Sequence, residues 1–140
     1  MARHTFVVFT NPTEGREDEF NDWYDNTHLS DVLKVEGFVA AQRFKLADTD
    51  PPQEFPHRYL ALYEVESDDL GKVAQALSEA GDSGAMFVSE SLDRSDVIAK
   101  YFNRANYITW LAVNMSLAKS RAHGRGGERH LGCSFECDFG

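Results

Sequence analysis

Apolar residues over the N-terminal two thirds of the chain repeat with two different periods, which predict strands and helices. Residues 4–10 are mostly β-branched or aromatic, and apolar side chains recur at every second position over 38–46 and 58–66. A shorter run of the same kind covers 96–102. Because alternate side chains of a strand point to opposite faces, these four segments are predicted strands.

Two segments between these strands have the spacing of amphipathic helices. The first covers about residues 14–33, and either Asn11 or Thr13 could cap its start. The second follows Ser67, carries apolar residues at every third or fourth position, and stops at Gly81. Each helix therefore has one face that is suited to packing on a sheet.

The order of these elements, β-α-β-β-α-β, predicts an α+β fold of the ferredoxin-like type. In this fold two helices cover one face of a four-stranded antiparallel sheet. The other face is open, yet neither face of the strands at 38–46 and 58–66 is fully polar. A second copy of the same sheet is the simplest cover for that apolar area. A homodimer that joins through the sheet faces is therefore expected.

The residues after the fourth strand are predicted to form a C-terminal extension. The apolar positions that recur there at helical spacing are Ile108, Leu111, Met115 and Ala118. They indicate an amphipathic helix within residues 106–122, whose stripe is buried on its own subunit or on a partner. The predicted organisation is a domain over residues 1–105, followed by a helix and tail over 106–140.

The composition is that of an acidic globular protein of a size that forms one domain. The chain has 140 residues, 42% of them hydrophobic, and a formal net charge of −9. Such a chain repels nucleic acid and anionic membranes, so neither is an expected partner. No charged and then apolar signal segment opens the chain, and no apolar run approaches the roughly 18 residues of a membrane span. A cytoplasmic location is therefore expected.

The first predicted helix carries side chains that can transfer protons. Tyr24 and His28 are four residues apart, and Asp25 and Asp31 each lie three residues from His28. Residues at these spacings are neighbours on a helix surface. An imidazole beside a carboxylate and a phenol can act as a general acid or base near neutral pH. The alternative interpretation is that the aromatic residues are core and that His28 is a hydrogen-bonded residue at the helix end.

The same helix carries a resemblance to a known family. Its pattern is Phe20-x-x-Trp23-Tyr24-Asp25-x-x-His28-Leu29-x-Asp31-Val32-Leu33. Further matching segments are Val35-Glu36-Gly37-Phe38, Ala40-Ala41-Gln42-Arg43-Phe44 and Arg58-Tyr59-Leu60-Ala61-Leu62-Tyr63-Glu64. Over about residues 4–102 the chain resembles the EthD-like branch of the dimeric α/β-barrel superfamily. The resemblance implies a dimer of ferredoxin-like subunits, each with a hydrophobic pocket between sheet and helices.

The resemblance also implies a cofactor-independent acid–base enzyme of the lyase, isomerase, cyclase or monooxygenase type. Its substrate would be a small hydrophobic carbonyl compound, aromatic or polyketide-like. In this hypothesis His28 moves the proton, Tyr24 binds the substrate oxygen, and Asp25 or Asp31 fixes the imidazole tautomer. The expected substrate-binding residues are Phe20, Trp23, Arg43, Tyr59 and Tyr63. The alternative is a non-catalytic dimer that binds a small ligand, or serves a stress response, through the same pocket.

A histidine and two cysteines near the C-terminus raise the question of a metal site. His130, Cys133 and Cys137 lie at successive spacings of three and four residues. Structural zinc sites more often show tight paired knuckles, so no metal is expected. The sequence also has no Walker loop, dinucleotide-binding glycine motif, nucleophile elbow or His-Glu-x-x-His motif. No cofactor is therefore expected.

Overall fold

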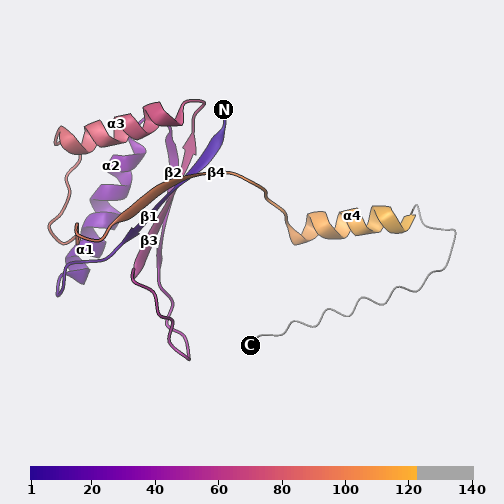
Figure 1. The fold of residues 1–140 in the computed structure, drawn as a ribbon, viewed down its shortest axis with the longest axis horizontal. Coiled ribbons are helices and arrows are strands. Elements are labelled where there is room, and N and C mark those ends of the chain that lie inside the picture. Colours follow the sequence, from indigo (N-terminus) through magenta and orange to yellow (C-terminus); the bar gives the residue numbers. More distant parts are fainter. Residues whose placement is uncertain (123–140) are drawn as a thin grey trace. The chain divides into compact units, whose positions relative to one another are not determined.

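A computed structural model describes residues 1–122, which fall into two units, Met1–Ala105 and a second unit that begins at Asn106. The elements of the first unit are, in order, β1 (Arg3–Thr10), α1 (Glu17–Trp23), the π-helical turn η1 (Tyr24–His28), α2 (Leu29–Leu33), β2 (Phe38–Lys45), β3 (Tyr59–Glu66), α3 (Leu70–Asp82) and β4 (Ile98–Asn103). The helices of this unit lie on one side of the sheet (Figure 1). The predicted element order and the α+β, ferredoxin-like fold are confirmed.

The four strands form one antiparallel sheet in the order β2-β3-β1-β4. At its centre, Phe6 of β1 lies between Tyr63 of β3 and Tyr101 of β4. The centre of the Phe6 ring is 4.3 Å from that of Tyr101 and 5.8 Å from that of Tyr63. Aromatic and β-branched residues pack well on a pleated surface, which is why they fill these strands. The central strands therefore present a wall of aromatic rings to the helices.

One strand, β2, contains an irregularity that its alternating sequence does not reveal. The register shifts so that Phe38 pairs with Val65 and Ala40 pairs with Glu64. An extra residue in a strand changes the face on which the preceding side chains lie. Phe38 is therefore buried on the helix-facing side together with Arg43, and the prediction that it shares a face with Ala40 was wrong.

The first helix begins later than predicted. Gly15 has a φ of 75°, and α1 starts only at Glu17. The side chain of Asn11 accepts a hydrogen bond from the backbone N–H of Arg58 at 2.8 Å. The hydroxyl of Thr13 donates to a backbone carbonyl of the loop after α3, also at 2.8 Å. The prediction of a cap at Asn11 or Thr13 was wrong because each side chain makes a tertiary contact instead.

Between α1 and α2 the chain makes a single π-helical turn. The backbone N–H of Leu29 donates to the carbonyl of Tyr24, five residues back instead of four. The wider turn gathers three rings: the centre of the His28 ring is 4.6 Å from that of Trp23 and 4.9 Å from that of Tyr24. Isolated π turns inside α-helices are frequent at functional sites. The predicted single helix is therefore continuous but changes its winding where the candidate catalytic residues lie.

The second helix, α3, begins as predicted. The Asp69 carboxylate accepts a hydrogen bond from the backbone N–H of Lys72 at 3.0 Å, a regular N-cap. The helix continues through Gly81 to Asp82, one residue beyond the predicted stop. The chain then turns at Gly84, which has a φ of 77°. The loop that follows leads to β4.

The two faces of the sheet differ in their cover. On the helix-facing side the side chains of Tyr63 and Val65 are almost completely buried. On the other side Phe44, Ile98 and Phe102 are 41%, 42% and 55% exposed within this unit. The open apolar face that the sequence predicts is therefore present.

The second unit contains the helix α4 (Trp110–Ala122). Within that unit Leu111 and Met115 are exposed, so burial of the predicted stripe requires a surface outside the helix. Its docking stays a prediction. None of the helices within residues 1–122 combines the length and the apolar character that a membrane crossing requires.

Gly37 allows a direct test of how the first helix packs on the sheet. Its φ is 102°, and a Cβ atom added there would lie 2.8 Å from the Cγ2 atom of Val73. We expect Gly37→Ala to lower the free energy of unfolding by about 2–4 kcal/mol, because strain and overlap add. Gly15→Ala is the matched control: its φ is also positive but the space is open, so about 1 kcal/mol is expected. Equal losses in urea unfolding would contradict this packing.

Candidate active site

A cavity of about 190 Å³ lies in the first unit between the helix-facing side of the sheet, the first helix and the loop after α3. Its walls are mainly apolar, and its polar lining residues are Thr10, Tyr24, His28 and Tyr63. An apolar cavity with a few convergent polar groups is the usual form of a small-molecule site. A larger hollow of about 430 Å³ beside α3 is lined by carboxylates and contains no histidine or tyrosine. The smaller cavity is therefore the better candidate for acid–base chemistry.

The imidazole of His28 lines this cavity. Its Nδ1 atom is buried and has no hydrogen-bond partner among residues 1–122. Nε2 is not enclosed in this way, so it is the ring nitrogen that a ligand can reach. Burial lowers the pKa of His28 to about 4; the Asp31 carboxylate opposes this lowering and the Arg43 cation adds to it. The ring is therefore neutral at pH 7 and able to accept a proton or a hydrogen bond.

Two phenols lie on the same cavity. Tyr24 comes from η1 and Tyr63 from β3, and they are only 2% and 1% exposed. Their hydroxyls face each other, although that of Tyr63 has no partner at hydrogen-bonding geometry in the described part of the chain. Burial raises the pKa of both phenols. Both therefore keep their protons at neutral pH and can donate a hydrogen bond to a ligand oxygen.

The two carboxylates that were expected to orient His28 have other partners. Asp25 accepts a hydrogen bond from Arg43 at 2.6 Å, and Asp31 accepts one from Lys34 at 3.0 Å. Within residues 1–122 neither carboxylate hydrogen-bonds to His28, so the prediction that one of them fixes its tautomer was wrong. Each has a nearer cation, and the π turn removes the regular helical spacing on which the prediction depended.

The expected substrate-binding residues fall into two groups. Trp23 and Tyr63 line the cavity. Phe20 and Tyr59 lie outside it, with ring centres 5.4 and 5.1 Å from the guanidinium carbon of Arg43. These two rings and Arg43 therefore support the site from behind and do not line it.

The loop between α3 and β4 forms one wall of the cavity. Met86, Val88 and Leu92 are the lining residues that it contributes. The indole N–H of Trp23 donates to the backbone carbonyl of Phe87 at 3.1 Å, which ties the loop to the first helix. Sequence reasoning missed this wall because the segment is rich in Gly and Ser. Its spaced apolar residues were the available signal.

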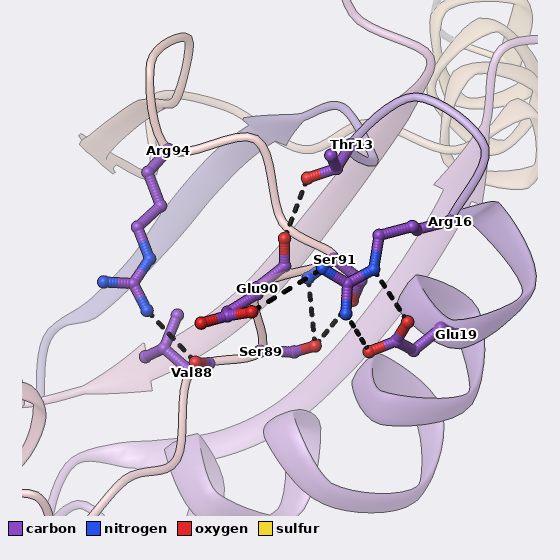
Figure 2. A network of polar contacts seen from close by, with 8 residues as sticks. All are labelled: Thr13, Arg16, Glu19, Val88, Ser89, Glu90, Ser91 and Arg94. Atoms are coloured by element: carbon purple, nitrogen blue, oxygen red, sulfur yellow. Dashed lines mark hydrogen bonds and ion pairs between the residues drawn. The ribbon is translucent and has the colours of Figure 1, made fainter.

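Polar contacts hold the same loop against the start of the first helix (Figure 2). The Thr13 hydroxyl donates to the carbonyl of Glu90 at 2.8 Å. The buried hydroxyls of Ser89 and Ser91 hydrogen-bond to each other at 2.7 Å. Arg94 donates to another backbone carbonyl of the loop at 3.1 Å. These bonds satisfy polar groups that the loop would otherwise bury unpaired, and they fix the position of the cavity wall.

Residues 1–122 contain no group of three or more His, Cys, Asp or Glu side chains that could hold a metal ion. His130, Cys133 and Cys137 lie outside the described residues. The expectation that they bind no metal therefore stays a prediction.

Two solved structures share this fold over most of their length. An EthD family protein from Bacillus halodurans C-125 is 15% identical, with a TM-score of 0.50, and the match covers 75% of this chain and 100% of that one. This chain has the EthD-like fold. The haem degrader MhuD from Mycobacterium tuberculosis, solved with two haems in its active site, is also 15% identical, with a TM-score of 0.52 and coverage of 76% and 99%. No family model matches the sequence.

One curated relative matches a shorter segment. Core atranone cluster (CAC) protein 1 from Stachybotrys chlorohalonatus is 42% identical over 57 residues. The match covers 41% of this chain and 22% of that relative. The chain therefore spans only about a fifth of the length of the relative.

A haem does not fit this cavity as it stands. Pockets for drug-sized ligands measure roughly 300–1,000 Å³, and a haem is at least that large. The volume of about 190 Å³ is below that range. The cavity suits a smaller molecule, such as a compound with one or two rings.

The depressed pKa of His28 predicts how the stability of the protein depends on pH. The pKa is about 4 in the folded chain against an ordinary value of 6.5, so between these values the unfolded chain binds the proton more strongly. The free energy of unfolding should therefore fall as the pH is lowered from 6.5 to 4, by at most about 3 kcal/mol from this group. His28→Gln should lack this part of the loss, as measured by urea unfolding at several pH values.

The control for this experiment is His4→Gln. His4 lies outside the cavity, and its two ring nitrogens hydrogen-bond to Asn103 and to the carbonyl of Ser67. A His28→Gln protein whose stability follows the wild-type pH dependence would contradict the neutral, buried state of His28.

Proposed function

We propose that this chain is a cofactor-independent acid–base enzyme that acts on a small hydrophobic carbonyl compound, aromatic or polyketide-like. The observation that carries the proposal is a neutral His28, without a hydrogen-bond partner at Nδ1, beside two protonated phenols on an apolar cavity. A desolvated base next to hydrogen-bond donors is suited to removing a proton adjacent to a carbonyl group. The relative named for an atranone cluster supports a small-molecule substrate.

The proposed chemistry begins with enolisation. The phenol of Tyr24, assisted by that of Tyr63, donates a hydrogen bond to the carbonyl oxygen, and Nε2 of His28 takes a proton from the adjacent carbon. Negative charge then develops on the oxygen, where the two donors stabilise it. The imidazolium formed in a buried site is a strong acid, so it readily returns the proton to another atom of the substrate. Proton removal and return of this kind serve isomerases, cyclases and lyases alike.

A second candidate function is ligand binding without chemistry. It is favoured by the lack of a carboxylate hydrogen-bonded to His28 within the described residues, because such a partner commonly orients a catalytic imidazole. The two candidates differ in one measurable respect. A binding protein would take up carbonyl compounds without exchanging their protons.

The proposed unit in solution is a homodimer that joins through the open faces of the sheets. The exposed apolar side chains of that face, among them Phe44, Ile98 and Phe102, support it. A two-fold interface places the same patch of each copy against the other, which suits a flat apolar sheet. The helix-facing side, with its cavity, would remain accessible in such a dimer.

The dimer can be tested with one charge. Phe102→Asp should convert a dimer into a monomer at micromolar concentration, as measured by light scattering coupled to size exclusion, because it buries a carboxylate in an apolar interface. Phe87→Asp is the matched control: Phe87 is 64% exposed but belongs to the loop on the other side of the sheet, so it should leave the mass unchanged. A monomeric wild type, or a Phe102→Asp protein that stays dimeric, would refute this interface.

Enolisation can be tested without knowing the complete reaction. In D2O the wild-type protein should exchange the acidic protons of one or more members of a panel of small aromatic ketones and β-diketones, as followed by NMR. His28→Ala should slow the exchange by about 10²–10⁴-fold. Tyr24→Phe should cost less, because only one hydrogen bond is lost. The double variant should be about as slow as His28→Ala, because both residues act on the same transition state.

The control for exchange is again His4→Gln, which should react at the wild-type rate. A His28→Ala protein that retains the full rate would end the catalytic proposal. A wild type that binds these compounds but exchanges none of their protons would favour the binding function.

A further inference from the structure

Arg43 occupies an unusual position for a charged residue on a strand. Its side chain is only 12% exposed. One guanidinium nitrogen donates to Asp25 at 2.6 Å and another donates to Asn21 at 2.9 Å. The guanidinium carbon lies 4.3 Å from the centre of the Tyr24 ring. A buried cation is costly unless it is paired and hydrogen-bonded, and these contacts meet that need.

These contacts surround the start of the π turn. Asn21 belongs to α1 and Asp25 to η1, four residues later, so the two arms of the guanidinium bridge the change of winding. Tyr24 lies between them: its ring packs on the cation outside, and the residue also lines the cavity. Arg43 therefore contacts the segment that carries Tyr24 and His28 without lining the cavity itself.

We propose that Arg43 is a positioning residue: from β2 its guanidinium clamps the π turn and the Tyr24 ring, and so sets how Tyr24 and His28 present their polar atoms to the cavity. As a statement about catalysis this rests on the proposed function. As a statement about the arrangement of the site it does not. The sequence had suggested that Arg43 binds a substrate carboxylate, and this proposal assigns it a different role.

The charge of Arg43 also acts on the site. The charged and titratable groups around His28 are Asp31 from α2, Arg43 from β2, Tyr24 from η1 and Tyr63 from β3. The cation of Arg43 contributes to the low pKa of His28 and opposes the rise in the pKa of both phenols. It therefore favours a neutral imidazole and stabilises negative charge that develops on the phenol side of the cavity.

The two contributions, charge and geometry, can be separated by two substitutions. Arg43→Met removes both. Arg43→Lys keeps the cation but loses the planar fork that binds Asn21 and Asp25 together. The readout is the NMR signal of His28 in the full-length protein, labelled at histidine and followed over pH without ligand. Because the His28 ring is 4.6 Å from the Trp23 ring, its proton shifts also report the geometry of the turn.

In Arg43→Met the pKa of His28 should rise by roughly half a unit or more, the size expected for loss of one nearby charge. In Arg43→Lys the pKa should stay near the wild-type value while the ring-proton shifts of His28 change at constant protonation. Asp25→Asn keeps a hydrogen-bond acceptor but removes the neutralising carboxylate, so it should move the pKa downward. Arg58→Met is the matched control, since its cation pairs with Glu17 and does not contact the π turn.

The proposal is overturned if the ring-proton shifts of His28 in Arg43→Lys equal those of the wild type, or if Arg43→Met leaves its pKa unchanged. If Arg43→Met does not fold, Arg43→Lys and Asp25→Asn decide the question. With an exchanging ketone in hand, Arg43→Lys should lower the turnover of exchange at least about 10-fold with little change in KM. A wild type that exchanges no ketone defeats the proposed function, and the NMR result then still decides the role of Arg43.

Discussion

The π-helical turn between Tyr24 and His28 is the constraint on which the rest of the site depends. One extra residue per turn moves the ring of His28 beside those of Trp23 and Tyr24, at 4.6 and 4.9 Å. In a regular α-helix the same residues would follow a different spacing, and Asp25 would be a neighbour of His28. The turn is held from both sides: Arg43 binds its outer side, and the indole of Trp23 binds the loop that covers the cavity.

Desolvation then determines the chemistry of the three polar side chains. Burial lowers the pKa of His28 and raises those of Tyr24 and Tyr63, so all three are uncharged at neutral pH. A buried polar atom without a partner costs roughly 1–3 kcal/mol. The site carries two such atoms, Nδ1 of His28 and the hydroxyl of Tyr63. Groups that are left unpaired in this way are common where a ligand supplies the missing contact.

The fold was predictable because it depends on periodicity. The strands around Phe6 and Tyr63 and the cap at Asp69 follow from alternation and local hydrogen bonding, which short stretches of sequence contain. The candidate site was predictable only in part. The sequence identified Tyr24, His28, Trp23 and Tyr63, which line one cavity.

The parts that were missed depend on contacts between distant segments. The π turn, the bulge after Phe38, the pairing of Asp25 with Arg43, and the cavity wall at Met86 all arise from tertiary packing. Local spacing cannot show which cation a carboxylate will choose, because the competing partner lies 18 residues away in the sequence. For the same reason a Gly- and Ser-rich loop gives little sign that it will close a cavity.

The central claim is that His28 Nε2 and the two phenols form one binding site for a carbonyl group. A crystal structure of the protein with a small aromatic ketone tests it most directly. The account predicts the ketone in the cavity, its oxygen within hydrogen-bond distance of the Tyr24 and Tyr63 hydroxyls and its acidic carbon facing Nε2 of His28. A ketone bound on the open face of the sheet, or one whose oxygen is turned away from both phenols, would contradict it.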